Sequence, residues 1–217
     1  YQGCNATLMP ADYAQALRAW CNNYKALMIF DEVQAGFGRT GAPFGFSHLH
    51  VVPDLAACGK GISGGMPLAA VLGTDELMGM YGPGEMTSTH SANPICAAAA
   101  LANLKVIREE KLVENAAKLT PVLADGLARI QQAASNRIGH IAAAGLVGAL
   151  QFTKPGTTEP VPELAWEMVL RAVQKGVMLF APVGVGGCAV KINPPLLIKR
   201  EALEEGLGVL ETVVKEL

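Results

Sequence analysis

Two ionisable residues that each follow a short apolar run could together carry out carbonyl chemistry. Lys60 stands between two glycines after the apolar residues 55–58, and Asp31 follows the apolar residues 26–30, 29 positions earlier. A lysine amine can condense with a carbonyl to form a Schiff base, and a fixed carboxylate can keep a heterocycle protonated. We therefore predict that Lys60 is a nucleophile and Asp31 its acidic partner. The flanking glycines are expected to let the ring of a ligand approach the backbone closely.

A nucleotide-binding function fits part of the same pattern. The apolar run that ends in Asp31 and Glu32 is also typical of the acidic strand of an ATPase. The phosphate loop of that class needs a serine or threonine after its lysine, whereas Gly61 follows Lys60. The ATPase therefore stays as a weaker alternative, as does an ordinary surface lysine.

Hydroxyl side chains gather in a glycine-containing loop just before a predicted helix. Thr87, Ser88 and Thr89 could bind a phosphate at the helix N-terminus, or one of them could cap the helix. The four histidines show no spacing typical of metal ligands. No metal site is predicted.

The composition indicates a globular protein without affinity for nucleic acid or membranes. Of 217 residues, 51% are hydrophobic and 17% charged, the formal net charge is -2, and basic residues form no block. The apolar stretches are shorter than the ~18 residues that a membrane span requires. Five widely spaced cysteines predict free thiols in a reducing cytoplasm. Because the sequence starts at Tyr1 without a methionine, we expect a piece of a longer protein.

Hydrophobic periodicity predicts the elements that position these residues. Strands alternating with helices favour an α/β architecture with a parallel or mixed sheet, and a domain boundary is expected near residue 110. Helices are predicted over residues 10–24, 94–109, 112–132, 162–175 and 199–216. Strands are predicted over 26–30, 55–58, 68–72, 177–180 and 189–192, with a strand pair over 138–152 and a long loop over 35–50.

An ordered series of motifs extends over nearly the whole chain. It comprises DEVQAGFGRTG at 31–41, PDL at 53–55, GKG at 59–61, GGMPL at 64–68 and STHSANP at 88–94. Together these motifs resemble the class III aminotransferases, which are pyridoxal-phosphate enzymes of fold type I. The resemblance implies that residues 1–110 are the second part of the large cofactor-binding domain, with a mixed, mainly parallel sheet. It also implies that residues 111–217 are a smaller C-terminal α+β domain.

The resemblance also assigns roles to individual residues. Lys60 would bind the cofactor as a Schiff base and move the substrate proton, and Asp31 would pair with the pyridine nitrogen. Val33 would pack against the cofactor ring and Gln34 would reach its phenolic oxygen. Thr89 would bind the cofactor phosphate of a neighbouring subunit, which implies a homodimer with shared active sites.

The sequence departs from the family pattern at residues that bind the substrate and the cofactor. Lys191 stands where relatives often carry an arginine for the substrate carboxylate, and a lysine can offer only a point charge. Gln2 and Gly3 match a family pair, but the acid and the phosphate loop expected before them are absent from the sequence. We expect weak cofactor binding by this chain alone and little turnover.

Transamination between an amino acid or amine and a 2-oxo acid is the predicted activity. A racemase, epimerase or decarboxylase would use the same Lys60 and Asp31, so these activities remain alternatives. A non-catalytic fragment that needs a separate N-terminal part is a further one.

Overall fold

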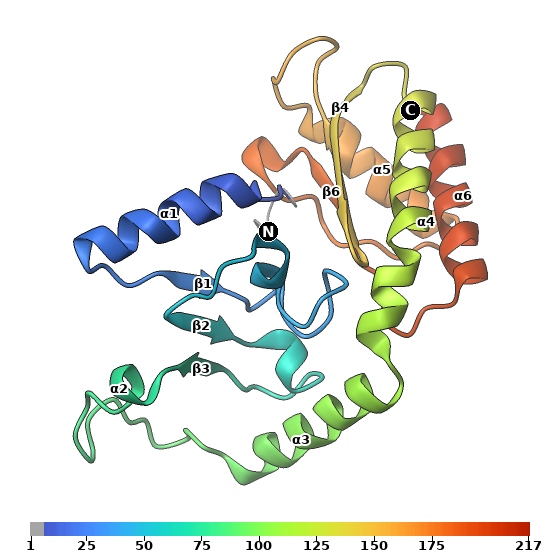
Figure 1. The fold of residues 1–217 in the computed structure, drawn as a ribbon. Helices are drawn as coiled ribbons and strands as arrows, with labels where there is room; N and C mark the ends of the chain where they lie inside the picture. The colour runs from blue at the N-terminus through green and yellow to red at the C-terminus, as the bar shows by residue number, and fades with distance from the viewer. Residues whose placement is uncertain (1–6) are drawn as a thin grey trace. The chain divides into compact units, whose positions relative to one another are not determined.

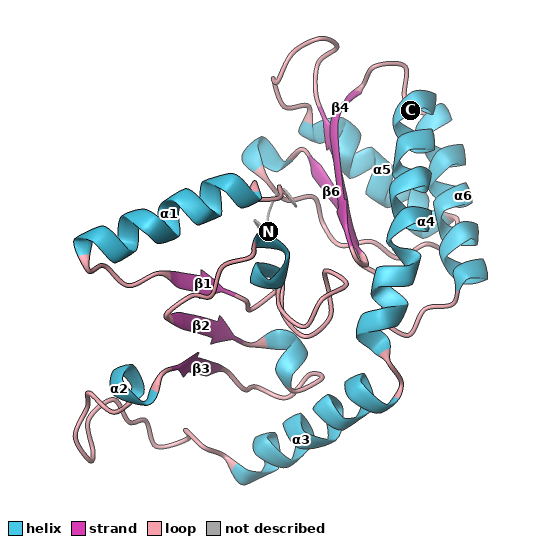
Figure 2. Ribbon diagram, in the orientation of Figure 1, coloured by secondary structure: helices cyan, strands magenta, loops and turns pink. Residues whose placement is uncertain are grey.

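A computed structural model describes residues 7–217, so Gln2, Gly3 and Cys4 lie outside the described residues. The described chain forms two compact units, one over Met9–Val113 and the other over Glu114–Leu217 together with residues 7–8 (Figure 1). Both units combine helices with a small sheet (Figure 2).

A three-stranded mixed sheet lies at the centre of the first unit. Strand β1 (Ile29–Asp31) pairs in parallel with β2 (Leu55–Cys58), and β3 (Ala70–Gly73) pairs with β2 in the antiparallel direction. The strand predicted at 55–58 is confirmed, and those predicted at 26–30 and 68–72 are displaced by a few residues. Because β1 and β2 are parallel, their carboxyl ends meet at one edge of the sheet.

The helices of the first unit agree with the sequence pattern. Helix α1 (Ala11–Tyr24) follows Pro10, which suits the start of a helix, and α3 (Pro94–Glu109) begins where the Asn93 side chain accepts from two main-chain N–H groups. Both confirm predicted helices. The short helix α2 (Asp75–Met78) and the 3-10 helices η1 (Gly45–Leu49) and η2 (Lys60–Ile62) were not predicted.

One carboxylate fixes α1 to the start of the sheet. The Oδ2 atom of Asp54 accepts a 2.6 Å hydrogen bond from the main-chain N–H of Met28 and a 2.7 Å bond from Nη1 of Arg18. The main-chain N–H of Asp54 donates in turn to the Met28 carbonyl at 2.8 Å. The Met28 carbonyl also accepts from the N–H of Leu55, the first residue of β2, at 3.3 Å, so these bonds lie where the pairing of β1 and β2 begins.

The second unit packs helices on an antiparallel sheet. Strands β4 (Ile138–Ala144), β5 (Val147–Phe152) and β6 (Ala189–Ile192) form the sheet in that order. One continuous core links it to three helices, and every one of these predicted elements is confirmed. The helices are α4 (Leu112–Ala133), α5 (Pro162–Gln174) and α6 (Arg200–Lys215), and a 3-10 turn, η3 (Val185–Gly187), precedes β6.

The strand predicted over residues 177–180 is wrong. The chain leaves α5 through Gly176, whose φ is 89°, and the main-chain N–H of Val177 donates to the Ala172 carbonyl at 2.9 Å. This bond closes the helix end. The apolar segment runs on without a ladder partner among the described residues. No α-helix within residues 7–217 combines the length and hydropathy that a membrane span requires.

Candidate active site

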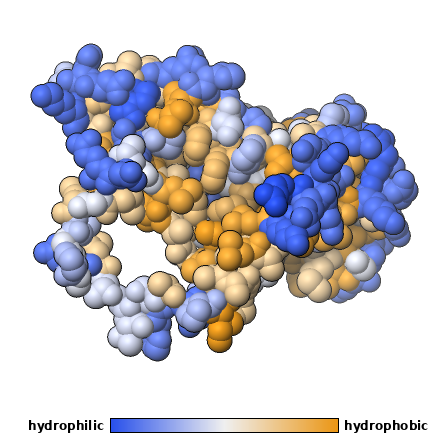
Figure 3. Space-filling view, turned by 60° about the horizontal axis from the view of Figure 1, so that its bottom comes forward, coloured by the Kyte–Doolittle hydropathy of each residue, from blue (hydrophilic) through white to orange (hydrophobic). Residues whose placement is uncertain are grey.

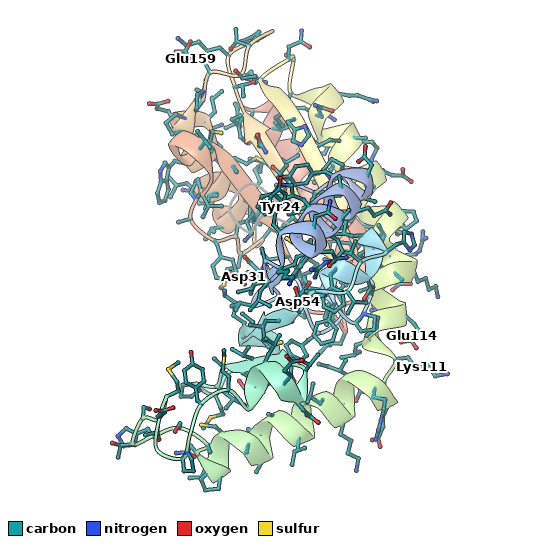
Figure 4. The ribbon with its side chains drawn as sticks, turned by 60° about the vertical axis from the view of Figure 1, so that its left-hand side comes forward. Tyr24, Asp31, Asp54, Lys111, Glu114 and Glu159 are labelled. Carbon is teal, nitrogen blue, oxygen red and sulfur yellow. The ribbon has the colours of Figure 1, made fainter. Side chains whose placement is uncertain are left out.

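The carboxyl edge of the first sheet carries both Asp31 and the turn that contains Lys60. Asp31 is the last residue of β1 and lies opposite Ala57 of β2. Lys60 follows Ala57 by three residues, at the start of η2. The topology therefore brings the predicted acid and amine to the same edge. Asp54 lies at the opposite edge, before β2, and both carboxylates are labelled in Figure 4.

Asp31 is exposed, and a local hydrogen bond orients its carboxylate. The Oδ1 atom accepts from the main-chain N–H of Val33 at 3.0 Å, a turn that aspartate readily forms with its own backbone. This bond fixes the plane of the carboxylate and engages one of its two oxygens. The other oxygen is suited to a nitrogen-bound proton of a ligand.

Glu32, the next residue, is buried and was not predicted to act. It follows the last residue of β1, and only 1% of its surface is exposed. Oε2 accepts from the main-chain N–H of Gly45 at 2.8 Å and Oε1 from that of Phe46 at 2.9 Å. Its own N–H donates to the Ala57 carbonyl at 2.8 Å. Glu32 thus ties the loop after β1 to both strands of the edge.

Side chains of the loop after β1 pack against the glycines that flank Lys60. A Cβ added at Gly59 would lie 3.3 Å from Cγ1 of Val33, and one added at Gly61 would lie 3.3 Å from Cβ of Phe37. Glycine is thus required at both positions because protein side chains pack where a Cβ would lie, while the predicted approach of a ligand ring to this turn stays a prediction. The packing places Val33 directly beside the Lys60 turn.

Lys60 itself is exposed and adopts an unusual backbone conformation. Its φ is 39°, in the left-handed region that residues other than glycine rarely adopt. The following turn closes with a 3.0 Å bond from the Ile62 N–H to the Gly59 carbonyl. Gln34 lies half-buried in the adjoining loop. Asp31, Val33, Gln34 and Lys60 thus belong to one edge of the sheet and its loops.

Thr89 belongs to a different part of the first unit. It is exposed, in a turn that closes with a 3.0 Å bond from the Ser91 N–H to the Ser88 carbonyl just before α3. The Lys60 turn contacts α3 at Asn103, nine residues beyond the start of the helix, or roughly 14 Å along its axis. The structure does not bring Thr89 to the Lys60 turn of its own chain.

Lys191 belongs to the second unit. It lies half-buried on β6, opposite Ala149 of β5. It lines a cavity of about 570 Å³ between the segment after α5, the Pro194-Pro195 pair and α6. Most of the other lining side chains are apolar, so Lys191 brings a cation to an apolar hollow.

The described cysteines are free, as predicted, and they are also buried. They are Cys21, Cys58, Cys96 and Cys188. Burial raises the pKa of the Cys58 thiol, and the nearby Glu32 charge raises it further. Burial likewise raises the pKa of Cys188. The thiols of Cys58 and Cys188 are therefore poor nucleophiles. Within the described residues no group of three or more His, Cys, Asp or Glu side chains could hold a metal ion.

Comparisons with known proteins agree on one family. The family model described as "Aminotransferase class-III" matches residues 3–214. A 4-aminobutyrate aminotransferase of Mycobacterium leprae is 37% identical over 98% of this chain and 48% of its own length. A 5-aminovalerate aminotransferase of Pseudomonas aeruginosa is 38% identical over 94% and 48%. The chain thus spans about half the length of the curated relatives it matches.

Solved structures show the same relationship. An ornithine aminotransferase from Plasmodium yoelii superposes with a TM-score of 0.86 at 32% identity, over 98% of this chain and 54% of that one. An acetylornithine aminotransferase from Elizabethkingia anophelis has a TM-score of 0.83 at 31% identity, over 94% and 49%. The fold is therefore a portion of fold type I, as the motifs had implied. By sequence and by structure, this chain belongs to the class III aminotransferase family, whose members depend on pyridoxal phosphate.

Proposed function

We propose that this chain carries the reactive part of a pyridoxal-phosphate-dependent aminotransferase, which transfers an amino group between an amino acid or amine and a 2-oxo acid. The main support for this proposal is that Asp31 and the Lys60 turn lie at the same edge of the sheet, with Val33 packed beside that turn. Relatives named as aminotransferases favour this reaction over racemisation or decarboxylation on the same residues.

The donor set at this edge fits the cofactor. When bound, pyridoxal phosphate supplies an electron sink for negative charge at the substrate Cα. The exposed amine of Lys60 is available for covalent attachment to the cofactor carbonyl and afterwards for moving the Cα proton. The Asp31 oxygen that Val33 does not engage would hold the proton on the pyridine nitrogen. Val33 would support the ring, and Gln34 would donate to the phenolic oxygen.

Trapping with borohydride tests the proposal. The chain is mixed with pyridoxal phosphate, reduced and digested, and peptide mass spectrometry should find the cofactor mass on Lys60. Lys111→Ala is a matched control because Lys111 is also an exposed lysine with a left-handed backbone, at φ 54°. Label that persists at equal yield in Lys60→Ala would rule out the assignment.

For the substrate, we propose an amino acid whose carboxylate pairs with Lys191. The names of the relatives specify 4-aminobutyrate and 5-aminovalerate, in which the amino group and the carboxylate lie at opposite ends of a short chain. Apolar walls around Lys191 suit the methylenes of such a chain. Lys191→Ala should raise the KM for these donors roughly tenfold to hundredfold, since one charged hydrogen bond is worth roughly 1.5–3 kcal/mol. An equal KM in the variant would dismiss Lys191 as the carboxylate site.

We also propose the homodimer and domain arrangement that the motifs imply. Residues 1–110 would complete the large domain and 111–217 form the small one, in a cytoplasmic enzyme. Exposed apolar side chains on α3, among them Ile95 at 68% and Leu101 at 72%, support burial against a second copy, and Figure 3 shows apolar residues at the surface. Thr89 lies away from the Lys60 turn of its own chain. This position supports a role in binding the phosphate of the cofactor that is held by the other subunit.

Complementation between variants tests the shared site. Copies with Lys60→Ala and copies with Thr89→Ala should each bind the cofactor poorly alone. When they are mixed, a shared arrangement restores one complete site in each mixed dimer, and trapped cofactor should reappear on Lys60. Sites built within one chain would give no recovery.

A further inference from the structure

We propose that Asn103 of α3 is a positioning residue that holds the Lys60 turn in its reactive conformation. The inference rests on the proposed function, because Lys60 must be the residue that binds the cofactor. It assigns a role to a side chain outside the motifs and 43 positions away from Lys60 in the sequence.

Asn103 makes the contacts that this role requires. Its Nδ2 atom donates to the Gly61 carbonyl at 2.8 Å and lies 3.4 Å from the Ile62 carbonyl, so the two residues after Lys60 both face it. A Cβ added at Gly64 would come within 2.9 Å of the Asn103 Oδ1 atom. The asparagine is therefore enclosed by the chain that continues from the Lys60 turn.

The conformation of Lys60 explains why such a contact matters. A left-handed backbone is disfavoured for a residue with a side chain, so the φ of 39° at Lys60 must be maintained by its surroundings. Val33 and Phe37 pack on the flanking glycines, but apolar contacts do not fix the orientation of a peptide group. The hydrogen bond from Asn103 does. It thereby directs the Lys60 side chain, and a misdirected amine reacts more slowly.

The type of residue supports the same inference. Helix α3 is rich in alanine, and asparagine is a poorer helix former than most residues around it. A half-buried asparagine in the middle of such a helix is therefore explained by its side-chain bonds.

The chain offers a matched control in its other unit. The Nδ2 atom of Asn115 on α4 donates to the Leu196 carbonyl at 2.6 Å and to the Ile198 carbonyl at 3.2 Å. This is the same side chain in the same kind of contact, between a helix and two carbonyls of a distant loop. That loop contains none of the residues that lie with Lys60 at the edge of the first sheet. Asn115→Ala therefore removes an equivalent hydrogen bond without changing a contact of the Lys60 turn.

The experiment compares Asn103→Ala, Asn103→Asp and Asn115→Ala in the 217-residue chain. Asn103→Asp keeps the shape of the side chain and loses its donor, so it reports on the bond when the alanine variant folds poorly. The rate of borohydride-trapped attachment at Lys60 is measured at several pyridoxal phosphate concentrations. Amide exchange across residues 59–64 is followed without cofactor.

We expect both Asn103 variants to attach the cofactor about fivefold to tenfold more slowly at saturation, which is the effect of one neutral hydrogen bond. The concentration at half-saturation should stay the same, and exchange at residues 59–64 should speed up. Asn115→Ala should match the wild type in all three measurements. If both Asn103 variants attached the cofactor to Lys60 at the wild-type rate, the role of Asn103 would be refuted and the proposed function would stand. Absence of label on Lys60 in the wild type would overturn the proposed function as well.

Discussion

Asp31 and Glu32 carry the same charged group in opposite surroundings, and their roles differ accordingly. Asp31 is exposed at the strand end, with one oxygen oriented by its own turn. Glu32 is buried, and main-chain donors engage both of its oxygens. Without these donors a buried carboxylate would be strongly disfavoured. Glu32 therefore serves the geometry of the edge, while Asp31 remains accessible to a ligand.

Replacing Glu32 with glutamine should loosen the loop after β1. The amide nitrogen of glutamine would face one of the two N–H groups, so either Gly45 or Phe46 would lose its acceptor. We expect a loss of about 1–3 kcal/mol in the free energy of unfolding, the effect of an unsatisfied buried group. Urea titration measures the loss, and amide exchange at Gly45 and Phe46 locates it. Glu76→Gln on exposed α2 is the control, and unchanged exchange at both amides would contradict the argument.

The Asp54 carboxylate should make stability depend on pH in the acid range. The hydrogen bond from the Met28 N–H, followed by that from Arg18, lowers the pKa of Asp54 from its ordinary 3.8. A lowered folded pKa stabilises the fold above the unfolded pKa, and this contribution is lost as the pH falls through the folded value. Asp54→Asn should therefore lower the melting temperature at pH 6. The difference from the wild type should shrink as the pH falls below about 3.8.

The same titration of Asp12→Asn isolates the effect of the Asp54 contacts. Asp12 lies on the same helix as Arg18 and its substitution changes the net charge equally. A melting difference for Asp54→Asn that stayed constant down to pH 2 would show that its charge state does not matter.

Among the elements, the sequence was most informative where the residues that begin and end an element lie within it or directly beside it. Helix α3 and strands β2 and β6 have the predicted bounds, because apolar periodicity, Pro94 and Asn93 all act locally. The error at residues 177–180 arose because an apolar run becomes a strand only beside a partner, and no local signal shows one. For the same reason the η2 turn and its contact with Asn103 were not predictable, since the contact joins residues that lie 41 or 42 positions apart in the sequence.

The packing of α4 against α6 gives a prediction for two glycines. A Cβ at Gly126 of α4 would lie 2.5 Å from Cδ1 and 3.0 Å from Cγ of Leu207, which is 2% exposed. Gly126→Ala should therefore destabilise the protein by about 1–3 kcal/mol despite the better helix propensity of alanine. Nothing lies within 4 Å of a Cβ at Gly208 of α6, so Gly208→Ala should stabilise by about 0.5–1 kcal/mol. Denaturant titration measures both, and effects of equal sign would refute the packing argument.

The two units of the molecule differ in how much apolar surface they bury. In the second unit one core runs from Ala116 to Val214 and joins every helix and strand. The core of the first unit centres on Ala14, Cys21, Met28 and Val51. Apolar side chains on β3 and α3 of that unit, such as Leu72 and Leu101, are exposed instead. Since burial supplies most of the stability of a fold, the first unit of this chain should be the weaker one.

Each unit contains one of the two tryptophans, so their unfolding can be followed separately. Trp20 lies on α1 of the first unit and Trp166 on α5 of the second. In the variant Trp166→Phe, the remaining Trp20 should report a transition at lower urea than Trp166 reports in Trp20→Phe. Leu123, fully buried in the large core, provides the decisive substitution. Leu123→Ala should weaken the Trp166 transition by about 3 kcal/mol, the usual loss for a buried leucine, and leave the Trp20 transition within about 0.5 kcal/mol. Coincident transitions at the two tryptophans, displaced together by Leu123→Ala, would mean that the units fold as one.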